Sequence, residues 1–103
     1  MTKPLRFDDD AAEEMEEAAQ RYEARRANLG RDFLEAVRTV TKRIAERPAT
    51  WLLAPGIDPE LGVRRCLLRR FPFAVIYLEL DDEIRILAVA HGHREPGYWR
   101  RRI

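Results

Sequence analysis

The chain has 103 residues, which is enough for a single compact domain with one hydrophobic core. Hydrophobic residues make up 46% of the sequence and charged residues 36%, a composition that excludes intrinsic disorder, and the net charge of +1 argues against a general nucleic-acid binder. The single cysteine, Cys66, excludes an intramolecular disulfide, and the lack of a signal peptide or of an apolar run near ~20 residues predicts a cytoplasmic protein without a membrane partner.

A short strand followed by an acidic helix is predicted at the N-terminus. Residues 5–7 alternate between apolar and polar side chains, as a strand does. Asp8, Asp9 and Asp10 are N-cap residue types, and Asp10 with Glu13 has the spacing of a capping box, so we expect the helix to begin there and to run to about Ala27. Its apolar stripe recurs at helical spacing, at Ala11, Met15, Ala18 and Tyr22. The stretch Asn28–Gly30 is a typical helix stop.

A second helix is predicted from near Arg31 to Pro48. Its apolar stripe is formed by Phe33, Val37, Val40 and Ile44. The connection between the helices is short, so they should lie antiparallel as a helical hairpin. Two helices cannot bury both stripes against each other alone, which predicts a sheet on one side.

The C-terminal half reads as a loop followed by three strands. Residues 48–62 are rich in proline and glycine and should form a loop that is packed down by its apolar residues, Trp51, Leu52 and Leu53. Strands are predicted over 63–70, 73–80 and 83–91, and their short connections favour an antiparallel meander. The predicted fold is therefore α+β, in the order β-α-α-β-β-β, with the helical hairpin packed on a small, mainly antiparallel sheet.

A cationic and aromatic cluster follows the last strand. Residues 1–30 carry five basic and eight acidic residues, whereas residues 94–103 carry four arginines and one glutamate. This asymmetry suggests an anionic partner for the C-terminal face, although a solvated or disordered basic terminus would give the same pattern. We interpret residues 1–103 as one domain with a basic C-terminal tail over 94–103.

Several segments together resemble the RelE/ParE superfamily of toxins. The resemblance covers nearly the whole chain and is carried by Arg64 and Arg65, the run from Phe71-Pro72-Phe73 to Tyr77, the run from Ile84 to His91, Arg94-Glu-Pro96, Tyr98-Trp99, and Arg101 or Arg102. The N-terminal half is similar to the ParE-like branch, with an acidic, Ala-rich first helix followed by Leu29-Gly30 and Phe33-Leu34.

The resemblance implies the toxin of a type II toxin–antitoxin system, held inactive by a cognate antitoxin that wraps its hairpin and sheet. RelE-like members cut messenger RNA on the ribosome, whereas ParE-like members act on DNA gyrase and are not nucleases. We favour gyrase as the target and expect no stable binding of the chain alone to DNA. The runner-up is a ribosome-dependent endoribonuclease, and a third possibility is a non-toxic relative that only pairs with the antitoxin.

The nuclease hypothesis can be stated in residues. Metal-free RNA cleavage needs a base, an acid and cations, which His91, Arg94 and Tyr98 would supply together with Arg65. The alternative is a framework role, in which His91 bonds a backbone group, Arg94 forms an ion pair and Trp99 caps the core. The spacing of His91 and His93 offers too few ligands for zinc, so we expect no metal and no cofactor.

Two binding surfaces are predicted instead. The antitoxin would contact apolar residues on the outside of the hairpin, namely Leu29, Leu34 and Val37, unless these face the core. The target would contact the residue types that most often dominate interface energy, here Trp99, Arg100, Arg101 and Arg102.

Overall fold

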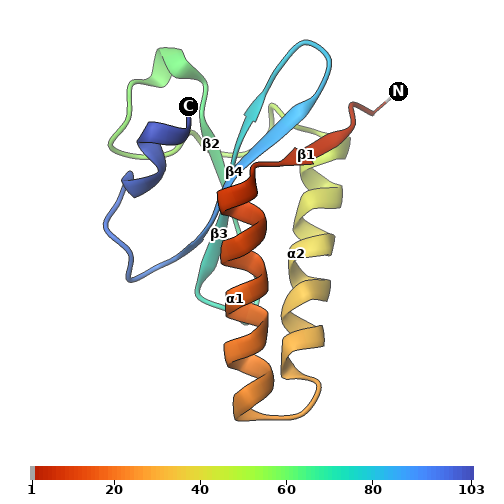
Figure 1. The fold of residues 1–103 in the computed structure, drawn as a ribbon. Coiled ribbons are helices and arrows are strands. Elements are labelled where there is room, and N and C mark those ends of the chain that lie inside the picture. The colour runs from red at the N-terminus through yellow and green to blue at the C-terminus, as the bar shows by residue number, and fades with distance from the viewer. Residues whose placement is uncertain (1) are drawn as a thin grey trace.

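A helical hairpin covers one face of a four-stranded sheet in the computed structural model, which describes residues 2–103 (Figure 1). The elements run in the order β1 (Leu5–Phe7), α1 (Asp9–Arg25), α2 (Leu29–Glu46), β2 (Arg64–Leu67), β3 (Phe73–Glu79) and β4 (Ile84–His91), with 3-10 helices η1 (Pro59–Leu61) before β2 and η2 (Tyr98–Arg102) at the C-terminus. The predicted α+β class and the order β-α-α-β-β-β are confirmed. None of the helices is long and apolar enough to cross a membrane.

The sheet has the strand order β1-β4-β3-β2. The last three strands form the predicted antiparallel meander, and β1 pairs in parallel with β4, with Leu5 opposite Ile84. A parallel neighbour is expected here because the helical hairpin provides the long crossover that two parallel strands need. The register between β3 and β4 shifts at Ile76 and Tyr77, which leaves Leu87 as an extra residue without a cross-strand partner.

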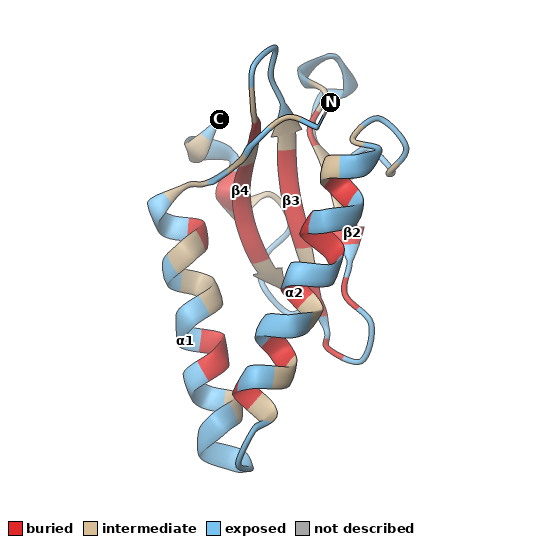
Figure 2. Cartoon of the chain, turned by 90° about the vertical axis from the view of Figure 1, so that its right-hand side faces the viewer, coloured by how far each residue is buried: buried red, intermediate tan, exposed pale blue. Residues whose placement is uncertain are grey.

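The first core lies between the hairpin and the sheet. Figure 2 shows buried residues along the sides of α1 and α2 that face the strands. At one end of this core, four aromatic rings pack with centroids about 5 to 6 Å apart, from Tyr22, Phe33, Phe71 and Phe73. Such pairs stabilise the fold by about 0.5–1.5 kcal/mol each beyond the burial of their area.

The turn of the hairpin differs from the prediction in its boundaries. The helix α2 begins at Leu29 rather than near Arg31, because Asn28 adopts the left-handed conformation with φ of 72° and acts as its N-cap. Gly30 is therefore a helical residue and not a stop signal. It is buried where α2 crosses α1, and a Cβ atom at Gly30 would stand 2.5 Å from the carbonyl oxygen of Ala19.

The predicted capping box at Asp10 and Glu13 is wrong. The helix α1 begins at Asp9, and its N-cap is Asp8, whose side chain makes no capping hydrogen bond. The Asp8 carboxylate instead accepts two hydrogen bonds from Arg85 on β4. A charged partner from the sheet, which local spacing cannot reveal, has taken the side chain away from the helix terminus.

A second core lies on the face of the sheet opposite the helical hairpin, as the framework alternative for Trp99 implied. Its buried residues come from the loop after α2, from the strands and from the C-terminal segment, namely Ala54, Val63, Ile76, Leu87, Ala88 and Trp99. In Figure 1 the C-terminal segment and the loop lie together on the side away from the helices. The loop packs differently from the prediction, because Leu52 and Leu53 are 73% and 39% exposed while Trp51 contacts the first core.

Candidate functional site

The four residues of the nuclease hypothesis line one cavity. Arg65, His91, Arg94 and Tyr98 surround a hollow of about 290 Å³ between the sheet and the C-terminal segment. Its remaining walls are mainly apolar and include Trp99. The topology explains the grouping, since β2 brings Arg65 to the same sheet face on which the chain folds back after His91. Sequence reasoning therefore grouped these residues correctly, and their chemical role depends on what each side chain is bonded to.

Tyr98 is engaged at both its hydroxyl group and its ring. The hydroxyl donates a 2.6 Å hydrogen bond to Oε2 of Glu14, and the Arg94 guanidinium lies over the ring at 3.9 Å from its centroid. Burial, followed by the hydrogen bond and the negative charge of Glu14, raises the pKa of Tyr98 well above its usual range. Tyr98 therefore remains protonated at neutral pH, and its proton is held by the carboxylate.

His91 is engaged at one ring nitrogen. Its Nδ1 accepts a 2.9 Å hydrogen bond from the backbone N–H of His93, so the neutral ring carries its proton on Nε2. The ring also packs edge-on against Phe73, with centroids 4.9 Å apart. Burial, followed by the positive charges of His93 and Arg21, lowers the pKa of His91 below its usual range. Neutral His91 is thus a hydrogen-bond donor at Nε2 and has no free basic nitrogen.

The C-terminal segment is ordered by its own contacts rather than disordered. Trp99 is only 4% exposed and packs in the second core, so the prediction that its ring lies on an exposed docking surface is wrong. Arg102 is also largely enclosed, because it forms ion pairs with Glu14 at 2.8 Å and with Asp10 at 3.5 Å. The physical reason is that η2 folds back onto the sheet and, with three residues per turn, places Trp99 and Arg102 on the same inward face.

The other two arginines of the segment face solvent. Arg100 is exposed and donates a hydrogen bond to the backbone carbonyl of Gly56, and Arg101 is exposed without an ion pair among residues 2–103. The predicted target-binding group thus divides into two inward anchors, Trp99 and Arg102, and two outward cations.

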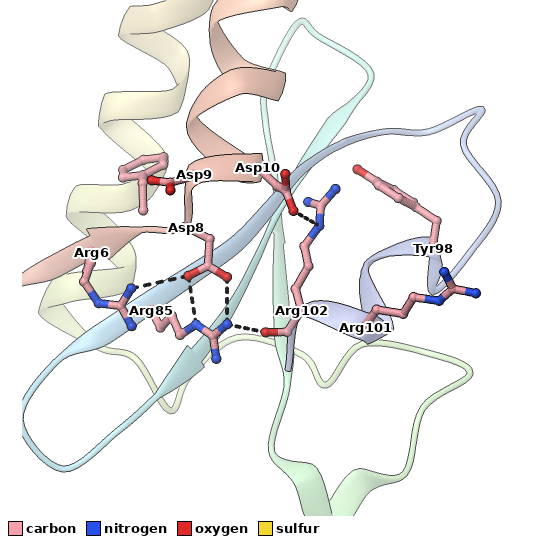
Figure 3. Close-up of a pocket in the computed structure, with 9 residues that line it drawn as sticks. Arg6, Asp8, Asp9, Asp10, Arg85, Tyr98, Arg101 and Arg102 are labelled. Atoms are coloured by element: carbon pink, nitrogen blue, oxygen red, sulfur yellow. Dashed lines mark hydrogen bonds and ion pairs between the residues drawn. The ribbon is translucent and has the colours of Figure 1, made fainter.

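A network of ion pairs joins η2 to the start of α1 and surrounds a hollow. Figure 3 shows Asp8 between Arg6 and Arg85, with Arg102 reaching toward Asp10. The hollow that they surround has a volume of about 660 Å³. Hydrogen bonding to Asp8 raises the pKa of Arg85 above its usual range. Because its acidic and basic groups neutralise each other, this network attaches the C-terminus to α1 and β4 and offers little net charge for binding a ligand.

The outer surface of the hairpin carries an apolar groove of about 490 Å³. Leu34 lies in its lining at 41% exposure, beside Met15, Ala19 and Gly30. Leu29 is half-buried against the first core. Val37 is 2% exposed, so the prediction that it contacts the antitoxin is wrong in this conformation. It belongs to the stripe of Phe33 that faces the sheet.

A second groove lies between α2 and the edge strand β2, at an exposed strand edge of the kind expected to accept the antitoxin, although its residues were not predicted. It has a volume of about 260 Å³ and is lined in part by Val40, Leu67 and Phe71, of which Leu67 is 63% exposed. Leu67 on β2 was the signal in the sequence, but recognising it required knowing that β2 ends the sheet. Exposed apolar edges of this kind accept an added strand.

The metal and thiol chemistry of the chain is limited. Within residues 2–103, no group of three or more His, Cys, Asp or Glu side chains is arranged to hold a metal ion. Cys66 is buried, and burial raises the pKa of its thiol, which makes it a poor nucleophile.

A helical hairpin packed on a four-stranded sheet is a fold that this chain shares with a chain of a solved ParDE system. A chain of the structure titled "Chromosomal ParDE TA system from P. aeruginosa" superimposes with a TM-score of 0.65 at 22% identity, covering 87% of this chain and 96% of that one. The family model for the ParE toxin of the type II toxin–antitoxin system parDE matches residues 5–96. The chain belongs to this ParE toxin family. No curated protein matches it.

Proposed function

We propose that the chain inhibits growth by binding DNA gyrase, that a cognate antitoxin neutralises it, and that it does not cut RNA. Both partners would be met in the cytoplasm. Gyrase is favoured because the matching family is ParE and because ParE-like toxins, unlike RelE-like ones, act on gyrase. The target and the neutralising antitoxin are what we propose, whereas membership of the toxin family follows from the family match.

The hydrogen bonds of Tyr98 and His91, the two proton-transfer groups of the nuclease hypothesis, are the main support for this proposal. RNA cleavage without a metal needs one group to take the 2′-hydroxyl proton and another to supply a proton to the leaving oxygen. Tyr98 is bonded to Glu14, and Nδ1 of His91 is bonded to the N–H of His93. Of the other charged groups in the lining, Arg65 and Arg94 are cations suited to binding rather than to proton transfer at neutral pH, and Glu95 is exposed to solvent.

The target surface would be the outward side of η2. Arg100 and Arg101 are exposed there, while Trp99 and Arg102 fix the segment from behind. A rigid backbone reduces the entropy lost when a surface arginine binds, so the buried pair supports the exposed pair. Arg94, stacked on Tyr98, extends the same cationic surface toward the cavity.

The antitoxin would bind the hairpin and the edge of the sheet. The groove beside Leu34 is apolar and suits the apolar face of a helix, and the groove beside Leu67, at the edge strand, suits an extended segment. A partner that binds both grooves would clasp α2 from two sides. This predicts that Leu34 and Leu67 contribute more to antitoxin affinity than Val37 does.

Expression of the chain without its antitoxin tests the target. Gyrase poisoning predicts DNA breaks and filamentous cells, together with inhibition of supercoiling by purified gyrase. Rapid loss of intact messenger RNA would instead establish the ribosome-dependent nuclease. Normal growth with a folded protein would support a non-toxic relative that only pairs with the antitoxin.

Variants separate binding from catalysis. Tyr98→Phe and His91→Gln should leave toxicity intact if the folded protein persists, since neither side chain transfers a proton in the proposed activity. Arg101→Glu should abolish toxicity, and Arg38→Glu on the exposed face of α2 is its matched control. Toxicity that vanishes in Tyr98→Phe but survives in Arg101→Glu would contradict the proposal.

The antitoxin surface is tested by a similar comparison. Leu34→Asp should weaken antitoxin binding, whereas Leu52→Asp, at an exposed leucine in the loop after α2, should not. Affinity can be measured by titration once the neighbouring antitoxin gene product has been purified. Equal effects of the two changes would show that the hairpin groove is not the docking site.

A further inference from the structure

A further cavity, which contains neither Arg100 nor Arg101, gathers three arginines and one histidine from three parts of the chain. It has a volume of about 370 Å³ and lies between the C-terminal half of α1 and the turn that joins β2 to β3. Arg21 and Arg25 come from α1, Arg70 comes from the turn, and His91 comes from the end of β4. The lining contains no carboxylate.

Aromatic rings fix two of these cations. The Arg25 guanidinium lies 5.7 Å from the centroid of the Tyr22 ring, and the Arg70 guanidinium lies 5.6 Å from that of Phe71. The two rings pack edge-on, with centroids 5.0 Å apart. A guanidinium stacked on a ring keeps its N–H groups free to donate in its own plane. The rings therefore form an apolar floor that holds the charged groups before any ligand arrives.

The backbone at Arg70 is held in an unfavourable conformation. Its φ is 70°, and Asn28 is the other non-glycine residue of positive φ among residues 2–103. Asn28 is explained as a helix cap, and asparagine tolerates the left-handed region, but arginine does so at a cost of about 1–2 kcal/mol. Glycine would fit this turn without strain. An arginine that keeps such a conformation points to a use for its side chain.

The positive charge of the cavity is poorly neutralised from within the chain. Among residues 2–103, no carboxylate lies within 4.0 Å of Arg21 or Arg25, and Asp32 reaches Arg70 only at 4.0 Å. The Arg70–Asp32 pair is exposed on both sides, so it adds little stability and screens little charge. His91 adds a donor at the wall, because its Nδ1 is occupied and its Nε2 carries the proton.

We propose that this cavity is a binding site for the phosphate group of a phosphate-bearing ligand. A phosphoryl group offers three acceptor oxygens and up to two negative charges, which suits donors that converge from three elements. A carboxylate offers two oxygens and one charge and would satisfy a single guanidinium fork. The phosphate could come from a free nucleotide or from a phosphodiester chain. The inference stands apart from the proposed target, since it uses neither Arg100 nor Arg101.

Calorimetric titration of the purified chain at low salt tests the site. The probes are inorganic pyrophosphate, ATP, a single-stranded oligonucleotide without terminal phosphates, and a hexaglutamate peptide. We expect saturable binding of at least one phosphate probe that exceeds binding of the peptide. Tighter binding of pyrophosphate and ATP would identify a free ligand as the source, and tighter binding of the oligonucleotide would identify a phosphodiester chain.

Arg70→Gly is the decisive variant. Glycine accepts the backbone conformation, and the strain that it relieves offsets the freedom that it adds to the unfolded chain, so the melting temperature should stay near that of the wild type. Phosphate affinity should fall by about tenfold or more, as it should in Arg25→Gln. Arg38→Gln removes the same charge from outside the cavity and should change affinity by less than about twofold.

Three results would overturn the proposal. One is the absence of saturable binding by every phosphate probe. Another is an equal loss of affinity in Arg38→Gln, which would show that binding follows net charge alone. The third is peptide binding as tight as phosphate binding with the same dependence on Arg70, which would reassign the cavity to acidic segments of a protein partner.

Discussion

Arg102 and Glu14 lie 88 positions apart in the sequence and form a bidentate pair, with distances of 2.8 Å from Nη1 to Oε1 and 3.1 Å from Nη2 to Oε2. Glu14 also accepts hydrogen bonds from the hydroxyl of Tyr98 and from the backbone N–H of Val89. The side chains of Glu14 and Arg102 are only 15% and 17% exposed. One carboxylate on α1 therefore joins β4 and the C-terminal segment to the helical hairpin.

Replacing Glu14 by alanine should detach the C-terminal segment. The change removes the closest carboxylate of the enclosed Arg102, which keeps Asp10 at 3.5 Å, and it leaves the Val89 N–H without its Glu14 acceptor, at a total cost of roughly 2–4 kcal/mol after allowance for the partial exposure of the pair. Hydrogen exchange of residues 98–103 should become fast, and urea unfolding should shift to lower denaturant. Glu13→Ala, at the exposed neighbouring position, serves as the control. Unchanged exchange in Glu14→Ala would show that the other contacts of the segment hold it without Glu14.

Much of the fold was predictable because the local spacing of apolar residues identifies most of its helices and strands. The stripe of Phe33 and Ile44 and the alternation of β4 each identify an element and its buried face without reference to the rest of the chain. The two-residue difference at the start of α2 arose because Gly30 has a packing reason that looks, in sequence, like a stop signal.

The site was less predictable because it depends on contacts between distant residues. The fold brings Arg65, His91, Arg94 and Tyr98 to one cavity, and their residue types together with the family resemblance were sufficient to group them. Spacing could not show that Tyr98 bonds to Glu14 or that Trp99 turns inward, since both depend on where the last residues fold back. A tryptophan followed by arginines, as Trp99 is, is equally typical of an interface and of a buried anchor.

Trp99→Ala tests the second core directly. The side chain is 4% exposed and fills the space between the sheet and the loop after α2, so its truncation should cost about 3–5 kcal/mol of unfolding free energy. Leu52→Ala, at a leucine that is 73% exposed, should change stability by less than about 0.5 kcal/mol. Chemical denaturation of the three proteins provides the comparison. A small effect at Trp99 would mean that the C-terminal segment contributes little to stability.

Gly30→Ala tests the close approach of the two helices. Helix propensity alone predicts a gain of about 1 kcal/mol from alanine. The added Cβ would instead stand 2.5 Å from the backbone oxygen of Ala19, so the hairpin must open, and we expect a net loss of about 1–3 kcal/mol. Gly92→Ala is the matched control, because its Cβ would meet only the Pro72 oxygen at an ordinary 3.5 Å. A rise in the melting temperature of Gly30→Ala would refute the tight crossing.

The titration of His91 should respond to a change on α1. Burial, followed by the positive charges of His93 and Arg21, lowers the pKa of His91 in the folded protein, so Arg21→Gln should raise it. Because the unfolded chain binds this proton more readily, His91 makes the fold less stable as pH falls below about 6.5, and Arg21→Gln should reduce that loss. Imidazole shifts measured by NMR across pH 4–8 give the pKa, and urea unfolding at the two ends of this range gives the stability. Arg38→Gln is the control, because Arg38 lines neither of the two cavities that His91 borders, and it should leave the titration of His91 unchanged. An unaltered His91 pKa in Arg21→Gln would mean that the charge of Arg21 does not reach the ring.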